Sequence, residues 1–284
     1  MHLVPGDPVQ MMVAQMQNVT LEQLHVIRDQ LGLDRPAWQQ AVLYVWNVLH
    51  GDFGVSIFGQ EPVLNLLLGR LPATLMLAFS GLLIALLIGF PLGILAAYNR
   101  GSALDNFLMV IAVLGVSVPA FWLGMLLLLT FSVYFHFIPV AGDGPASAIL
   151  PALTLGLVYS AIIARLTRSA IIEVLSEDYI RTARAKGLSE AVILFRHALK
   201  PSMIAVITTI GMIFGYLMGG QVIVENVFSW NGIGRLAVQS MLQRDYPIIQ
   251  GFVVVFATII MIVSIILDLT YAWLDPRIRF GEKG

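Results

Sequence analysis

Long apolar runs, almost free of charge, are the feature that most restricts how this chain can fold. A membrane-spanning helix needs about 20 mainly apolar residues, and five stretches approach or exceed this length. They run from about Leu71 to Tyr98, from Phe107 to Tyr134, from Leu150 to Leu166, from Ile204 to Val224 and from Ile249 to Trp273. Since backbone polar groups cannot stay unpaired in hydrocarbon, the runs predict an all-α membrane protein, a polytopic bundle of transmembrane helices.

The composition agrees with this prediction and excludes other classes of protein. Hydrophobic residues make up 58% of the chain and charged residues 12%, whereas a soluble globular protein usually carries about 25% charged residues. The formal net charge of −1 provides no overall basic field for nucleic acid. Because the chain contains no cysteine, disulfides and thiolate metal sites are excluded. Pro119 interrupts the second run and predicts a kinked helix.

The distribution of lysine and arginine predicts the orientation, because cytoplasmic loops near membrane spans are enriched in both. The connection between the third and fourth runs is basic, whereas residues 136–149 contain neither lysine nor arginine. The basic residues of this connection and of the helix end before it are Arg165, Arg168, Arg181, Arg184, Lys186, Arg196 and Lys200. We therefore expect a transmembrane domain at residues 71–274, which includes a cytoplasmic loop at 167–202, and a cytoplasmic tail at 275–284.

Alternation of the spans places residues 1–70 outside the cell, without an anchoring helix ahead of them. The opening MHLVPGDP is typical of the outer end of a hydrophobic segment. We hypothesise that an upstream first transmembrane helix belongs to the natural subunit. Two short amphipathic helices are predicted within this segment, one with Leu21, Leu24, Ile27 and Leu31 and one with Val42, Val45, Trp46 and Leu49. They would lie on the membrane surface or against a partner, and packing between loops is an equal alternative.

One stretch of the basic loop is the most specific part of the sequence, EVLSEDYIRTARAKGLSEAVILFRHALKP at residues 173–201. Gly187 predicts the end of one helix, and Ser189 is a suitable N-cap for the next. Ala183 and Ala185 are small residues just before the glycine. The pattern predicts a helix, a sharp turn and a second helix, with little bulk at the turn, so that a soluble partner could approach closely.

This stretch resembles the cytoplasmic motif of permease subunits of ATP-binding-cassette (ABC) importers, in the form of the dipeptide and oligopeptide branch. Ala183 and Gly187 match the general importer pattern, whereas Arg181 and Thr182 stand where most importers have glutamate and alanine. Asn231 replaces the family's usual proline. Other similar landmarks are HLVPGDP at the start, HGDFGVS from His50, ENVFSWNGIGRL from Glu225, RDYPIIQG from Arg244 and LDPRIRF from Leu274.

The resemblance implies the type I permease fold of ABC importers and a coupling loop that docks into an ATPase subunit. The docking residues it implies are Arg181, Thr182, Ala183, Arg184, Ala185, Lys186, Gly187, Leu188, Ser189 and Glu190. It also implies partners in a bacterial inner membrane system: a second homologous permease subunit, two cytoplasmic ATP-binding subunits and a periplasmic solute-binding protein. The imported solutes would be dipeptides, oligopeptides or similar small molecules.

No phosphate-binding GxxxxGK[ST] motif occurs in the chain. We therefore expect a non-catalytic subunit that binds no cofactor or metal and whose partners use ATP. His197 has no further ligands at metal spacing, so a packing or capping role is favoured. Membrane lipid is expected around the spans, and nucleic acid is not expected as a partner.

Single polar residues in or near the spans are weaker candidates. Ser117, Thr130 and Thr208 could line a translocation path, although isolated hydroxyls more often bond within their own helix. Asp268 is the only acidic residue well inside a predicted span, where we favour a structural role. Glu225, at the outer end of its span, could face the path or anchor the membrane interface.

Two other classes of protein remain open at this point. A secondary transporter or channel without an ATPase partner would explain the spans, but such proteins normally carry several charges within their helices. A membrane-embedded enzyme would need paired catalytic residues at one depth, and the sequence shows no such pair.

Overall fold

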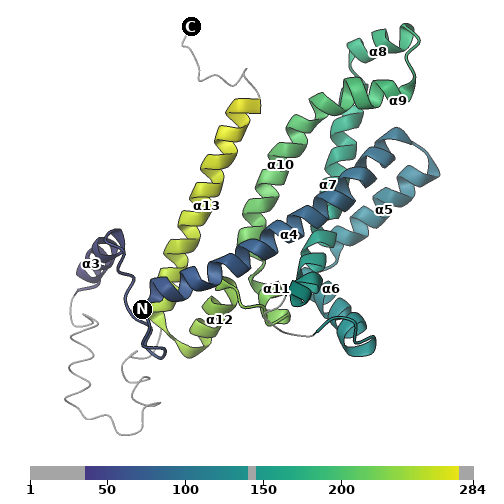
Figure 1. The fold of residues 1–284 in the computed structure, drawn as a ribbon. Helices are drawn as coiled ribbons and strands as arrows, with labels where there is room; N and C mark the ends of the chain where they lie inside the picture. The colour runs from purple at the N-terminus through teal and green to yellow at the C-terminus, as the bar shows by residue number, and fades with distance from the viewer. Residues whose placement is uncertain (1–35, 140–144, 275–284) are drawn as a thin grey trace, which may run out of the picture. The chain divides into compact units, whose positions relative to one another are not determined.

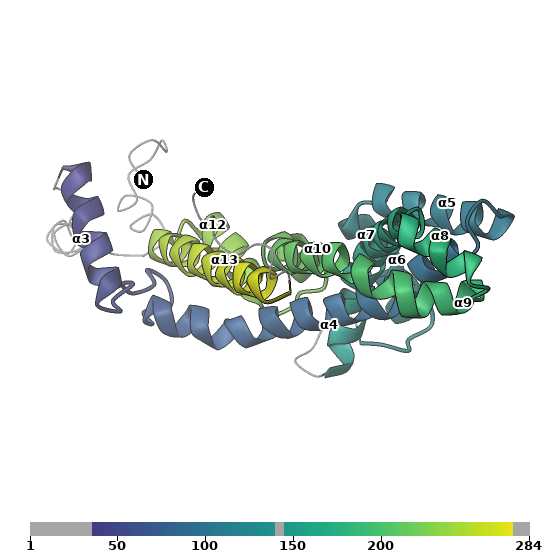
Figure 2. The ribbon, with the colours of Figure 1, turned by 90° about the horizontal axis from the view of Figure 1, so that it is seen from above.

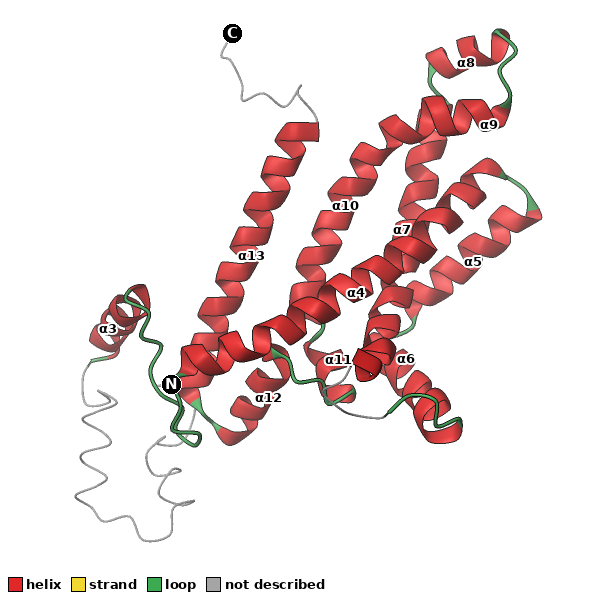
Figure 3. Ribbon diagram, in the orientation of Figure 1, coloured by secondary structure: helices red, strands yellow, loops and turns green. Residues whose placement is uncertain are grey.

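The computed structural model describes residues 36–139 and 145–274, and these ranges consist of helices joined by short loops (Figures 1 and 3). The α-helices are α3 (Ala37–Leu49), α4 (Val63–Tyr98), α5 (Ala103–Ser117), α6 (Ala120–Leu127), α7 (Ile149–Leu175), α8 (Asp178–Ala185), α9 (Glu190–Val192), α10 (Leu199–Gly220), α11 (Val222–Val227), α12 (Ile233–Gln243) and α13 (Tyr246–Leu274). Two π-helical segments, Leu128–Tyr134 and Ile193–Ala198, and a 3-10 helix at Pro145–Ala148 complete the described helices. The expected tail and the first predicted amphipathic helix lie outside the described residues.

Four continuous helical stretches are long and apolar enough to cross a membrane: Val63–Tyr98, Ala146–Leu175, Glu190–Met218 and Tyr246–Leu267. A fifth candidate consists of Ala103–Ser117 and Ala120–Tyr134, which meet at an angle of 98°. Residues 36–139 and 145–274 therefore contain up to five spans if the bent pair counts as one, in agreement with the five apolar runs of the sequence.

The break between α5 and α6 is much sharper than the kink that the sequence predicted. Pro119 has φ −61° and ψ 133°, and Val118 before it has φ −82° and ψ 122°, so both residues are extended. A proline disfavours the helical conformation in the residue that precedes it, and it also lacks the N–H that would continue the ladder. The helix therefore ends at Ser117, and a new one begins at Ala120.

The chain divides into two compact units, which are described separately. The first comprises Met1–Leu71 and Leu236–Val255. Within its described part, an apolar cluster joins Val63 and Leu67 of α4 to Leu236 and Ile248. The α4–α13 contact is close, because a Cβ atom at Gly251 would lie 2.6 Å from Cγ1 of Val63. Helix α3 of this unit exposes an apolar face, formed by Trp38, Val42, Val45, Trp46 and Leu49.

A buried carboxylate fixes the loop between α3 and α4. The Ser56 hydroxyl donates to Oδ2 of Asp245 at 2.6 Å, and the Ile57 N–H donates to the same oxygen at 3.1 Å. Ser56 and Asp245 are almost fully buried. Two of the landmark motifs, HGDFGVS and RDYPIIQG, are therefore in direct contact in the first unit.

The second unit comprises Pro72–Arg235 and Phe256–Gly284, and α7 is its central helix. In the apolar window of α7, 61% of residues are buried, whereas in that of α13 only 11% are. The largest apolar cluster of the unit includes Leu77 and Ala85 of α4, Leu155 and Ile163 of α7, and Leu217 of α10. Figures 1 and 2 show α7 between α5 and α10.

Glycines allow α4 and α7 to cross at very short range. A Cβ atom at Gly89 would lie 2.4 Å from the Ser160 carbonyl oxygen, and one at Gly93 would lie 2.6 Å from the Ala164 carbonyl oxygen. On the α7 side, a Cβ atom at Gly156 would lie 2.4 Å from Ile84. Small residues permit such close backbone approach between membrane helices, where packing rather than the hydrophobic effect drives association. We call this contact the glycine seam.

We predict that Gly93→Val destabilises the second unit, because the added atoms would meet backbone rather than a flexible side chain. Overpacking of this kind typically costs about 1–3 kcal/mol. Gly69→Ala, in the same helix, is the matched control, because a Cβ atom there meets nothing within 4 Å. Its effect should be neutral or stabilising by up to about 1 kcal/mol. Melting temperatures of the detergent-solubilised variants test the difference, and equal melting temperatures would contradict the seam.

Candidate functional site

The basic segment between α7 and α10 forms a small folded projection. Helix α7 ends at Leu175, α8 follows after Ser176 and Glu177, and α9 continues through the π-helical segment into α10. Figures 1 and 2 both show α8 beside α9, at one end of α7 and α10. We call residues 178–192 the coupling segment.

Helix α8 buries one face and exposes the other. Ile180 and Ala183 pack with Ile193 and Ala198 of the π-helical segment. The family resemblance placed Ala183 among the docking residues. In the structure its side chain is 8% exposed, so its size serves the internal packing of the segment.

Gly187 ends α8 in the manner that the sequence predicted. Its φ is +81°, which lies in the left-handed region that favours glycine. The Leu188 N–H donates to the Ala183 carbonyl at 3.4 Å, and the Gly187 N–H donates to the Arg184 carbonyl at 2.9 Å. These two bonds form a Schellman motif, which satisfies the last carbonyls of the helix. Ser189 takes the N-cap position of α9, but its side chain makes no capping hydrogen bond.

An ion pair closes the turn on its outer side. Nε and Nη2 of Arg184 donate to the two carboxylate oxygens of Glu190 at 2.7 and 3.1 Å. The hydrogen bond with Glu190 raises the pKa of the Arg184 guanidinium. Both side chains are substantially exposed, so the pair contributes at most about 1 kcal/mol to stability and mainly restricts the geometry of the turn.

The outer face of the coupling segment is exposed, basic and partly apolar. Tyr179 and Leu188 are 46% and 37% exposed, although both are large and hydrophobic. Besides Leu188, the predicted docking residues with exposed side chains are Arg181, Thr182, Arg184, Ala185, Lys186, Ser189 and Glu190. Arg181 lies 3.7 Å from Asp178, in a pair that is almost completely exposed. The exposed face thus presents basic groups around an apolar patch. The buried face of α8 holds its backbone in place by packing against the π-helical segment.

A further ion pair, between α5 and α7, was not predicted from the sequence. Nε and Nη2 of Arg168 donate to Oδ1 and Oδ2 of Asp105 at 2.5 and 2.7 Å. The Asp105 side chain is 1% exposed and that of Arg168 27%. Oδ2 of Asp105 also accepts the Gly101 N–H at 2.9 Å, and Ser102 caps α5 by accepting the Asp105 N–H. The one available signal was the Ser102–Asp105 spacing, which is typical of a helix N-terminus and does not indicate Arg168.

Glu225 lies in a buried polar cluster of the second unit, where its carboxylate is bonded to neighbouring groups of the protein. The residue is fully buried. Its Oε1 accepts the Thr74 hydroxyl at 2.8 Å, and its Oε2 accepts the Arg235 N–H at 2.9 Å. Gly232 makes room for the carboxylate, because a Cβ atom there would lie 2.2 Å from Oε1. Burial raises the pKa of Glu225, whereas the N–H groups of Arg235 and Gly234 and the Thr74 hydroxyl act in the opposite direction.

Further bonds connect this cluster to α4. Oγ1 of Thr74 accepts the Ile233 N–H at 2.9 Å, and Gln221 donates to the Thr74 carbonyl at 3.1 Å. The Trp230 indole donates to the Ala73 carbonyl at 3.0 Å. The motif ENVFSWNGIGRL therefore forms a bonded turn around Glu225, and Asn231 is accommodated within it.

We predict that Glu225→Ala strongly destabilises the second unit, because it leaves the Thr74 hydroxyl and the Arg235 N–H without their acceptor. Each buried group that loses its partner costs about 1–3 kcal/mol. Glu173→Ala removes the same kind of side chain from an exposed position, where the change should stay within about 0.5 kcal/mol. Thermal unfolding in detergent compares the two, and equal losses would show that the cluster contributes nothing specific.

The predicted path residues are spread over three helical segments. The Ser117 hydroxyl donates to the Val113 carbonyl and that of Thr208 to the Ile204 carbonyl, each at 2.9 Å within its own helix. Thr130 is exposed in the π-helical segment after α6. The side chain of Asp268 lies outside what the structure describes. The His197 carbonyl accepts the Tyr179 hydroxyl at 3.4 Å, and the described residues contain no group of three or more potential metal ligands.

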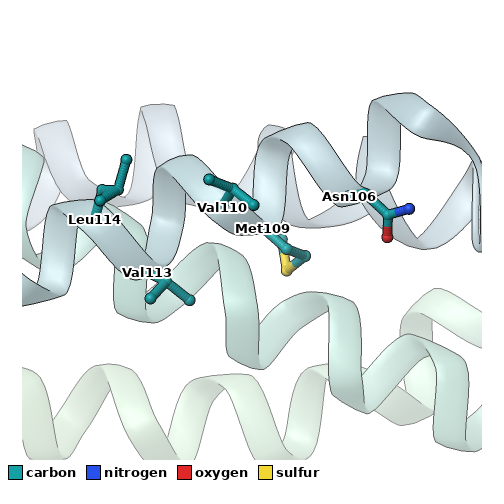
Figure 4. A pocket seen from close by; sticks show the side chains of 5 residues that line it. All are labelled: Asn106, Met109, Val110, Val113 and Leu114. Atoms are coloured by element: carbon teal, nitrogen blue, oxygen red, sulfur yellow. The ribbon is translucent and has the colours of Figure 1, made fainter.

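A hollow of about 430 Å³ lies along α5 (Figure 4). It is lined by Asn106, Met109, Val110, Val113 and Leu114. All five residues belong to one helix, and none of them carries a charge. The hollow is therefore an apolar surface suited to contact with lipid or another helix, and it has no groups that would hold a charged solute.

Comparison with known families identifies the class of protein that this fold represents. A model of the family described as binding-protein-dependent transport system inner membrane component matches residues 89–280. This range exceeds half of the chain and contains the coupling segment. The chain belongs to this family of transport permeases and is a multi-pass membrane protein.

Particular relatives are similar over almost the whole chain. The dipeptide transport system permease protein DppB of Escherichia coli (strain K12) is 39% identical over 310 residues, covering 98% of this chain and 91% of DppB. The glutathione transport system permease protein GsiC of the same strain is 42% identical over 280 residues, with the same coverage of 98% and 91%.

Solved structures show the same fold at lower identity. The inward-facing MetNI methionine ABC transporter matches with a TM-score of 0.61 at 19% identity, over 74% of this chain and 96% of that chain. An amino acid ABC transporter crystallised with histidines matches with a TM-score of 0.59 at 19% identity, over 72% and 92%. The fold is that of ABC importer permeases.

Proposed function

We propose that this chain is a transmembrane subunit of an ATP-driven importer in a bacterial inner membrane, and that it imports dipeptides, oligopeptides or a similar solute. Its partners would be a second homologous permease, two cytoplasmic ATPase subunits and a periplasmic solute-binding protein. The similarity to permeases named for dipeptide and glutathione transport supports this substrate class.

One observation carries the proposal: one face of the coupling segment is packed against the π-helical segment, and the opposite face is exposed. Ile180 and Ala183 attach α8 to the π-helical segment, while Tyr179 and Leu188 remain exposed beside basic side chains. A protein partner gains most from exposed apolar groups that are held in a fixed arrangement, since little conformational freedom is then lost on binding. We assign this surface to the ATPase, with Arg181, Thr182, Ala185, Lys186 and Leu188 in contact with it.

The remaining predicted docking residues then shape the surface. Gly187 and Ser189 set the turn, Ala183 supports it from within, and the Arg184–Glu190 pair closes it. In the proposed mechanism, ATP binding brings the two ATPases together and displaces the coupling segment, and the attached helices change access to a central path. Ser117, Thr130 and Thr208 remain proposed contributors to that path.

We predict that Gly187→Trp abolishes ATPase binding while Gly187→Ala preserves most of it. A Cβ atom at Gly187 meets nothing within 4 Å, so a large side chain there would occupy the space of a docked partner. Both variants have the same left-handed backbone, which costs about 1–2 kcal/mol for any residue with a Cβ atom. The difference between them therefore measures the bulk at the interface.

The test co-expresses the tagged subunit with the genes that flank its own and measures co-purified ATPase and peptide uptake. Loss of both with Trp, and retention of both with Ala, supports the proposal. Docking at this surface is refuted if the Trp variant retains full ATPase binding and uptake. If uptake by the wild type needs no ATPase at all, the chain works as a secondary transporter or channel.

A further inference from the structure

We infer that Asp105 and Arg168 are positioning residues that transmit the movement of the coupling segment to the α4–α5 hairpin. This inference rests on the proposed function, because it assumes that an ATPase moves the coupling segment. It assigns a role in coupling to two residues that contact neither the ATPase surface nor the candidate path residues.

The geometry of the pair favours the transmission of movement. Both guanidinium–carboxylate bonds are short, and a bidentate pair restricts orientation as well as distance. Apolar contacts alone permit sliding, because they have no preferred direction. Asp105 also binds the Gly101 N–H, so its carboxylate attaches both the start of α5 and the turn before it to α7.

The pair is located where the coupling segment joins the bundle. Arg168 lies about two turns before the end of α7 at Leu175, and α8 begins shortly after that end. Close by, Ala97 of α4, Ile171 of α7 and Leu194 of the π-helical segment form one apolar cluster. The C-terminal ends of α4 and α7 therefore meet the π-helical segment that follows the coupling segment.

The glycine seam extends the same connection along α4. At Gly93, a Cβ atom would lie 2.7 Å from Cβ of Thr167, the neighbour of Arg168. Helix α7 is thus held to α4 by close packing and to α5 by the ion pair. A displacement of the end of α7 must carry both helices with it, unless the ion pair breaks.

A buried ion pair of this kind is weak evidence for stability alone. Its desolvation cost is comparable to its attraction, and its best-attested role is to specify one arrangement among several. The exposed Arg184–Glu190 pair shows the contrast, because it lies within the coupling segment and connects no two membrane helices. The Asp105–Arg168 pair is therefore suited to coupling rather than simple anchoring.

The test uses the complete transporter, with its ATPases and binding protein, reconstituted in liposomes. The variants are Arg168→Gln, Arg168→Lys and Asp105→Asn. We expect basal ATPase activity to remain within about twofold of wild type, whereas stimulation by the binding protein and solute uptake fall about tenfold, which is within the usual range of a coupling between two sites. Arg168→Lys should be intermediate, because it keeps the charge but loses the bidentate geometry.

Arg165→Gln is the matched control, because it removes the same charge from an exposed position on the same helix. It should behave as wild type. A purely structural role predicts a different result, in which the melting temperature and protein yield fall while the ratio of solute transported to ATP hydrolysed is unchanged. If Arg168→Gln does not fold, the ratio of solute transported to ATP hydrolysed is measured with Arg168→Lys instead.

A distance measurement gives a second, independent readout. Since this chain contains no cysteine, Arg100→Cys and Glu173→Cys place its two spin labels, one in the turn after α4 and one near the end of α7, when the chain is labelled before it is assembled with its partners. In the wild-type background the distance should be the same with and without ATP, and in the Arg168→Gln background it should change with ATP. An unchanged distance in both backgrounds, with an unchanged transport ratio, would overturn the inference. Failure of the wild type to bind any ATPase would instead refute the proposed function.

Discussion

The close crossing of α4 and α7 is the contact on which the rest of the second unit depends. Gly89 and Gly93 bring the backbones of the two helices together, and α7 then provides the surface for α5 and α10. In a lipid environment, packing of this kind replaces the hydrophobic effect as the main source of helix association. Two polar groups lie in this bundle: the Asp105–Arg168 pair toward the C-terminal end of α7, and the Glu225 cluster just after the C-terminal end of α10.

The coupling segment combines two requirements that usually conflict. A surface that binds a partner must be exposed, and a surface that transmits movement must be rigid. Here Ile180 and Ala183 provide rigidity through burial, and the Schellman turn at Gly187 fixes the backbone without adding side-chain bulk. The exposed face can therefore vary in sequence with the partner, while the buried face and the glycine stay constrained by the fold.

The sequence predicted those features that local rules determine. Five apolar runs gave the spans, Gly187 gave the turn, and the resemblance in residues 173–201 gave the family. It did not predict the 98° break at Pro119, because the effect of a proline depends on whether neighbouring helices re-satisfy the ladder. Contacts between residues far apart in the chain could not be predicted from the sequence either. Arg168 was read as one of several basic residues of a cytoplasmic flank, and Glu225 as a residue near the interface, because neither burial nor a partner in another helix is visible in local spacing.

The clamp between Ser56 and Asp245 has a consequence for the order in which the protein matures. The two residues are 189 positions apart in the chain. At synthesis rates of about 5–20 residues per second, roughly 10–40 s pass between the synthesis of Ser56 and that of Asp245. During that interval Ser56 and Ile57 lack the acceptor that holds them in the finished molecule. The loop before α4 is thus synthesised early but becomes ordered late, because its closure requires the residue that directly precedes α13.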